Sequence, residues 1–271
     1  MKLLSRATPM AVVLCLCAAA AQAATGIQIT EKTTGAGHDL TSRIQIDQHR
    51  MRVETTGAEA GHRAFVFDGT KQVLWILNVD KQTYQEVTKE DLQRLSQQVS
   101  GAMAQMQAQL EKMPPEQRKR MEEMMKNMPG MPGGAQAKIV PTTYRKTGTA
   151  TVGKWTCQVW EGQRDGQKVS EVCTVPPAAL GFSPADFDVA RQLGGFFQQI
   201  MPANADRMFS VGGADDNGTS FTGIPVRRVD FGGAGQTVSE ITDIGRQDFP
   251  DSTFEVPAGF RKEPFAVGPR P

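Results

Sequence analysis

Short runs in which apolar and polar residues alternate recur along most of the chain. Six of them lie between residues 26 and 87, and glycine-rich or Asp-containing turns such as 35–37, 68–69 and 80–81 separate them. The six runs are residues 27–29, 44–46, 51–53, 64–67, 73–79 and 84–87. Alternation of this kind predicts half-buried strands, and consecutive short strands joined by tight turns predict an antiparallel meander.

The strand pattern returns in the second half of the chain. It runs from residue 138 through a hairpin around residue 165, and recurs at 226–231, 238–244 and 254–256. The regular alternation of strand and helix that builds parallel sheets is absent, which argues against a Rossmann-type enzyme.

A Met-rich helical segment interrupts the strands at about residues 88–134. Thr88 begins a capping box with Asp91, and Pro114-Pro115 ends the helix. Between the cap and the prolines, apolar residues recur at spacings of three and four: Leu92, Leu95, Val99, Met103, Met106, Leu110 and Met113. A second helix is expected with a stripe of Met121, Met125 and Met128, and the segment 129–134 ends it.

Another helix is predicted at residues 183–201. Ser183 is its cap and Pro184 occupies the first helical position. Its apolar stripe consists of Phe187, Leu193, Phe196, Phe197 and Ile200. Because the sheet is the only large surface available to cover, we expect an α+β fold in which helices cover an antiparallel sheet.

The first 23 residues have the features of a cleaved signal peptide. Lys2 and Arg6 precede the apolar run 11–20, which is too short to cross a bilayer, and Ala21-Gln22-Ala23 has the small-x-small form of a cleavage site. We expect a periplasmic or secreted protein with one domain at residues 24–263 and a tail at 264–271. Leucine precedes both Cys15 and Cys17, which argues against a lipoprotein anchor.

Export leaves Cys157 and Cys173 in an oxidising compartment, where a pair of cysteines suggests one disulfide. The residues between them fit a hairpin with a three-residue loop, in which Gly166 is left-handed. Centring that turn on Asp165 places the two cysteines directly opposite each other. The alternative, a redox-active dithiol, normally has a CxxC spacing that is absent here.

The overall charge excludes several classes of partner. The chain has 30 basic and 29 acidic residues, and removal of Lys2 and Arg6 leaves 28 basic against 29 acidic residues. A nucleic-acid partner is therefore not expected. No run of 18 apolar residues occurs, so no integral membrane span is expected.

The opening strands resemble a known group of proteins. The segments 44–54, 67–69 and 77–84, the Met-rich helix around Pro114-Pro115 and the strand that contains Cys157 are similar to exported bacterial proteins grouped as domain of unknown function 4412. The resemblance implies a half-barrel like that of the outer-membrane lipoprotein carriers, with helices closing its concave face. It implies no activity, because the group has none assigned.

Catalytic and cofactor motifs are missing from the sequence. The three histidines, His38, His49 and His62, have no HExxH spacing, and no serine lies in a GxSxG elbow. Gly-rich phosphate loops are absent as well. We expect a protein that is not an enzyme and needs no cofactor.

Methionine is the unusual component. Eight of the 13 methionines fall between Met103 and Met131. Thioethers are soft ligands that select Cu(I), but methionine is also an adaptable filler for apolar surfaces that open and close. An apolar docking or lid surface is favoured, plain packing of the helices comes next and copper binding last, and no metal ligand is assigned.

These observations favour an envelope protein that shelters an apolar ligand, such as an acyl chain or a lipoprotein lipid, between sheet and helices. The residues expected to line that site are Phe187, Leu193, Phe196, Phe197, Ile200, Met103 and Met106. The alternative is a structural or partner-binding envelope protein with a packed interior, and copper binding by the Met-rich helices comes third.

Overall fold

The structure is a computed structural model of the whole chain. It describes residues 24–58, 60–118, 120, 141–198, 221–232 and 235–265. The expected signal peptide, the stripe Met121, Met125 and Met128 of the second Met-rich helix, Ile200 and most of the expected tail lie outside these residues.

The first half of the sheet is the predicted meander. Its strands are β1 (Ala24–Gly35), β2 (His38–Ile46), β3 (Arg50–Gly57), β4 (Gly61–Asp68), β5 (Val73–Asn78) and β6 (Thr83–Thr88). Each strand pairs antiparallel with the next, so all six predicted runs are confirmed as strands.

The second half continues the same sheet. Its strands are β7 (Thr143–Val152), β8 (Trp155–Arg164), β9 (Gln167–Val175), β10 (Ile224–Gly232) and β11 (Gly235–Phe249). Pairing of β1 with β11 joins the two halves, and the short strand β12 (Arg261–Glu263) adds to β6 in parallel. The described residues thus form one open 12-stranded sheet, with β12 and β7 at its edges.

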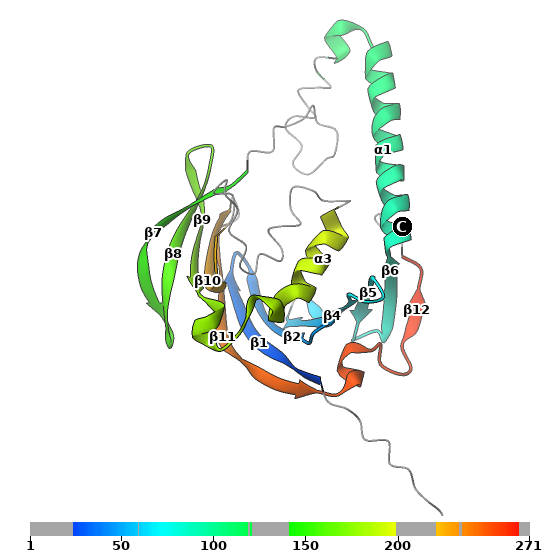
Figure 1. Cartoon of the computed structure of the whole chain (residues 1–271). Coiled ribbons are helices and arrows are strands. Elements are labelled where there is room, and N and C mark those ends of the chain that lie inside the picture. Colours follow the sequence, from blue (N-terminus) through cyan, green and yellow to red (C-terminus); the bar gives the residue numbers. More distant parts are fainter. Residues whose placement is uncertain are drawn as a thin grey trace, which may run out of the picture.

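The sheet is strongly curved, and each face carries a hydrophobic core. Figure 1 shows strands β7–β10 and β4–β6 as facing walls with helix α3 inside the curve. The concave core contains Ile27, Phe67, Cys173 and apolar residues of α3. The convex core is smaller and lies beneath the C-terminal segment; it consists of Ala64, Val66, Leu77, Phe249 and Phe254. Strand alternation supplies both cores, because Val66 and Phe67 point to opposite faces.

Helix α3 (Asp188–Gln198) covers the concave face, as predicted. The 3-10 turns η1 (Pro177–Leu180) and η2 (Pro184–Phe187) lead into it. Ser183 and Asp186 form the capping box at the start of η2, and the Asp186 carboxylate also pairs with Arg246 of β11 at 3.0 Å. This ion pair fixes the entry of the helix to the middle of the sheet.

Helix α1 (Lys89–Lys112) follows β6 directly and extends away from the sheet (Figure 1). Its capping box between Thr88 and Asp91 is confirmed, and it ends at Met113 before the two prolines, as predicted. The connection that contains α1 carries the chain from β6, near one edge, to β7 at the other edge.

The predicted disulfide is present, but its strand register differs from the prediction. Cys157 and Cys173 are bonded, with their Cα atoms 5.4 Å apart. The turn has two residues rather than three, because Asp165 and Gly166 both take positive φ angles, as an Asp-Gly type I′ turn requires. A β-bulge after Gly162 then shifts the pairing, so that Cys173 lies opposite Val159 and diagonal to Cys157.

The strand predicted at residues 254–256 is wrong. Residues Asp251–Phe254 form a 3-10 turn, η3, whose Phe254 packs its ring against Phe249 on the convex face. The alternation at 254–256 reflects this single buried anchor, because Glu255 and Val256 pair with no strand.

Candidate functional site

Two neighbouring rows of apolar side chains cross the concave face of the first meander. The deeper row is fully buried and, in register, consists of Ile27, Ile46, Met51, Phe67, Leu74 and Val87. The second row lies two residues further along each strand: Ile44, Val53, Phe65 and Ile76. We call this second row the apolar ledge.

Helix α3 covers the deeper row and leaves much of the ledge accessible. The ring of Phe196 on α3 lies 5.4 Å from that of Phe67 in the deeper row. On the ledge, Phe65 is 39% exposed, and its three neighbours are only partly buried. A contiguous apolar strip therefore borders the covered core.

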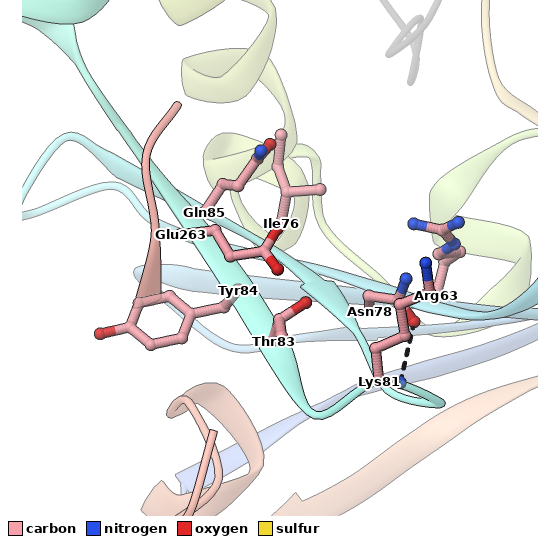
Figure 2. Close-up of a pocket in the computed structure, with 8 residues that line it drawn as sticks. All are labelled: Arg63, Ile76, Asn78, Lys81, Thr83, Tyr84, Gln85 and Glu263. Carbon is pink, nitrogen blue, oxygen red and sulfur yellow. Dashed lines mark hydrogen bonds between the residues drawn. The ribbon is translucent and has the colours of Figure 1, made fainter. Parts of the chain in front are cut away.

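A pocket of about 250 Å³ lies at the β4–β6 end of the ledge. Its lining residues are Arg63, Ile76, Asn78, Lys81, Thr83, Tyr84, Gln85 and Glu263. We call it the rim pocket. Figure 2 shows Arg63, Asn78 and Lys81 grouped at one end and Ile76, Gln85 and Glu263 at the other, while the Tyr84 ring points away from both groups. Through Ile76 the pocket is continuous with the ledge.

Polar side chains form the outer border of the ledge. Arg63 on β4 lies opposite Asn78 on β5, which in turn lies opposite Thr83 on β6. The Asn78 side-chain oxygen accepts a hydrogen bond from the backbone N–H of Lys81 at 3.1 Å, which holds the β5–β6 turn. The concave face thus carries three successive rows of side chains. The first is apolar and buried, the second is apolar and partly accessible, and the third is polar and includes the cation Arg63.

The structure places the predicted α3 residues in two environments. Phe187, Leu193 and Phe196 are buried in the concave core, whereas Phe197 is partly buried and packs edge-on against Phe196. Ile200 lies outside the described residues. The three buried residues belong to the packed core in this structure.

The predicted α1 residues do not join the α3 residues in one described pocket. Met106 is partly exposed on α1, and the side chain of Met103 is outside the described set. The main contact of α1 with the sheet is at β6, from which it extends away (Figure 1).

Sequence reasoning missed Phe65, Ile76 and Arg63, although it identified their strands. The available signal was the odd-numbered set Phe65 and Phe67, which shares one face of β4. The exposure of Phe65 depends on how much of the sheet α3 covers. Local sequence does not determine this, because it depends on tertiary packing.

A larger pocket of about 410 Å³ lies between the β1–β2 strands and the start of α3, and polar groups line much of it. The buried Asp47 carboxylate accepts hydrogen bonds from the backbone N–H groups of His49 and Arg50 and pairs with the Arg50 guanidinium. Asp186 is engaged by Ser183 and Arg246. These groups hold a turn and a helix start together, which is a structural role.

A charged cluster lies on the convex face. Glu54 contacts the His62 ring and pairs with Arg52 at 3.1 Å. Burial alone would raise the pKa of Glu54, but the hydrogen bond from His62 and the Arg52 charge outweigh it and lower this pKa. The three side chains therefore form one hydrogen-bonded and ion-paired group on the convex face.

A second exposed phenylalanine lies on the opposite half of the sheet. Phe231 is 40% exposed, and the Lys168 ammonium lies 5.2 Å from its ring centroid. It lines a pocket of about 210 Å³ in which Arg228 is held by Asp230. Unlike Phe65, it is not flanked by an exposed apolar row.

The described part of the chain lacks the features of a membrane-spanning helix and of a metal site built from His, Cys, Asp or Glu. Those residues contain no helix that is both long and apolar enough to cross a membrane. They also contain no group of three or more His, Cys, Asp or Glu side chains placed to hold a metal ion. The methionines at 121–131 lie outside the described residues, so the copper hypothesis stays a prediction.

Comparison with known proteins gives structural similarity without a sequence match. No family model and no curated protein matches the chain, so the resemblance to the domain of unknown function 4412 group stays a prediction. An uncharacterized conserved protein from Thermus thermophilus is 8% identical, with a TM-score of 0.45 over 89% of this chain and 91% of that one. A chain in the MucA/MucB complex structure from Pseudomonas aeruginosa is 12% identical, with a TM-score of 0.35 over 87% of this chain and 56% of that one. This similarity concerns the fold alone and carries nothing about ligand, partner or activity.

Proposed function

We propose that this protein is a non-enzymatic envelope protein that binds an acyl chain on the concave face of a half-barrel, along the apolar ledge beside α3. The supporting observation is the ledge itself, four apolar side chains in register on adjacent strands with Phe65 39% exposed at its centre. Four strands span about 14 Å, which suits an extended alkyl chain.

The ledge favours a ligand over a fully packed interior. Single exposed apolar residues are normal on a protein surface, but a contiguous row bordering a core is typical of a binding surface. A chain laid across Ile44, Val53, Phe65 and Ile76 would extend the buried core by one row. Binding then needs no large rearrangement of α3, because the deeper row stays covered.

An envelope location fits the cysteine chemistry. The bond between Cys157 and Cys173 joins two core positions, and disulfides form and persist in oxidising compartments. Together with the signal-peptide pattern of residues 1–23, this supports export to the periplasm. The absence of catalytic motifs supports a binding protein rather than an enzyme.

The test is a titration of delipidated mature protein with a fluorescent fatty acid. We expect saturable binding at one equivalent and a rise in melting temperature, because the ligand binds only the folded state. Phe65→Ser should weaken binding about tenfold, in line with the loss of a buried aromatic contact. The matched control is Phe231→Ser, which removes an equally exposed ring from the other half of the sheet.

The control variant also shows whether weaker binding results merely from losing a surface ring or from a loss of stability. Both variants remove a surface ring, so both should keep the wild-type melting temperature without ligand. Absence of saturable binding across chain lengths would overturn the proposal. Equal weakening by the two variants would move the site away from the ledge.

A further inference from the structure

The rim pocket contains two cations that the fold does not use. Arg63 and Lys81 are exposed, and neither has an ion-pair or side-chain hydrogen-bond partner among the described residues. Several other cations of the first meander are engaged: Arg50 pairs with Asp47 and Asp251, and Lys71 pairs with Asp68. What distinguishes Arg63 and Lys81 is that these two cations line one pocket.

The surrounding groups suit an anion with several oxygen atoms. Asn78 lies directly opposite Arg63, and Gln85 and Thr83 line the same pocket from β6. The nearby acids leave the two cations available, because Asp80 accepts a hydrogen bond from the His62 backbone N–H and Glu263 lies toward the Gln85 end (Figure 2). A guanidinium and an ammonium together bind phosphate or carboxylate oxygens through charge-assisted hydrogen bonds.

The position of the pocket relative to the ledge sets the class of ligand. Ile76 belongs to both, and Arg63 lies two residues from Phe65 on the same face of β4. An acyl chain on the ledge would therefore place its head group beside Arg63 and Lys81. We infer that the site takes an anionic amphiphile, with the acyl chain on the ledge and a phosphate or carboxylate head group in the rim pocket.

This inference rests on the proposed function, and a matched pair of ligands tests the two separately. Lysophosphatidic acid and the monoacylglycerol of the same chain length differ only by the phosphate, and both are used below their aggregation concentrations. Isothermal titration at low ionic strength should show lysophosphatidic acid binding about tenfold more tightly, with the preference falling as salt is added. Glycerol 3-phosphate alone should bind weakly, because it lacks the chain.

Charge-removing variants locate the head group. The double variant Arg63→Gln, Lys81→Gln should bring lysophosphatidic acid to the affinity of the monoacylglycerol and leave the latter unchanged. Arg43→Gln is the control, because Arg43 is also exposed and without a partner among the described residues, but it lies on the opposite face of the sheet, next in sequence to the ledge residue Ile44.

The outcomes separate the two proposals. Equal affinity of the two ligands, or a preference that survives the double variant, overturns the anionic head group and leaves acyl-chain binding intact. Tight binding of glycerol 3-phosphate would overturn the amphiphile in favour of a free phosphate ester. Binding of none of the three ligands overturns both proposals.

Discussion

Helices α1 and α3 have similar apolar stripes in the sequence and opposite positions in the fold. Helix α3 buries Leu193 and Phe196 against the concave face, and the turn η2 before it buries Phe187, whereas in α1 only Leu92 is fully buried among the described side chains. The connections explain the difference. Helix α3 lies within the link between the adjacent strands β9 and β10, which holds it over the sheet, while α1 begins the link between the two ends of the sheet.

The comparison shows that an apolar stripe predicts a need for burial without predicting the surface that meets it. A stripe in a link between neighbouring strands has the sheet within reach. A stripe that leaves the sheet near its edge has only its first turn in contact, as Leu92 shows. Helix α3 should therefore contribute to the stability of the whole domain, whereas α1 should contribute little to it.

The largest effect on stability should come from shortening one apolar side chain of α3, and the same change on α1 is its matched comparison. Phe196→Ala should lower the free energy of unfolding by about 3–5 kcal/mol, because it opens a cavity against Phe67. Met106→Ala should change it by less than about 0.5 kcal/mol, because Met106 is partly exposed on α1. Urea unfolding of the disulfide-intact protein measures both, and equal losses would show that α1 is also packed into a core.

Loss of the disulfide should have the second largest effect on stability. It should loosen α3 and leave α1 unchanged. Replacing Cys157 and Cys173 by serine should cost about 2–4 kcal/mol, since their bond closes a short loop within the concave core. Hydrogen exchange should become faster in α3 and stay unchanged in α1. Thiol titration of the unreduced, denatured wild type should find no free thiol, and two free thiols would refute the pairing.

The cap of α1 should have a smaller and purely local effect. In Thr88→Ala the capping box with Asp91 is lost, which costs about 1 kcal/mol of helix stability. Because α1 contacts the sheet mainly at β6, this loss should appear as faster exchange along α1, with little change in the global unfolding midpoint. A matching fall in global stability would mean that α1 folds cooperatively with the sheet.

Local patterns in the sequence predicted the elements well because each depends on neighbouring residues. Alternation identified the six strands of the first meander, the capping box of Thr88 marked the start of α1, and the cap Ser183 marked the start of η2, which leads into α3. The disulfide partners followed from the hairpin, although the bulge after Gly162 changed their register. A bulge inserts one residue without altering composition, so no pattern of hydrophobic positions revealed it.

The candidate site was beyond these patterns. The predicted lining residues Leu193 and Phe196 are apolar enough for either core or ligand; both pack in the concave core, and their contact with a ligand stays a prediction. Phe65 and Arg63 looked like ordinary strand residues until the curvature of the sheet and the position of α3 left them accessible. Sequence patterns therefore predicted which side chains share one face of the sheet. The position of α3 determines which row of that face stays accessible.

The smallest expected effect is a difference in how the two helices respond to acid. Both capping carboxylates, Asp91 and Asp186, are partly buried, which alone would raise the pKa of each. Hydrogen bonds from the cap residues Thr88 and Ser183 and a neighbouring arginine outweigh the burial, so both pKa values are lowered. A carboxylate with a lowered pKa in the folded state contributes stability that is complete above its unfolded pKa, and this stability is lost as pH falls through the folded value.

The partners of the two carboxylates determine what the acid loosens. Asp91 pairs with Arg94 of its own helix, so its protonation should affect α1 alone. Asp186 pairs with Arg246 of β11, so its protonation should release the start of α3 from the sheet. As pH falls from about 5 to about 3, hydrogen exchange at the start of α3 should rise together with that of the adjacent β11 amides. In Asp186→Asn this coupled, pH-dependent rise should disappear while that of α1 persists, and a rise confined to α3 in the wild type would show that the ion pair does not join helix and sheet.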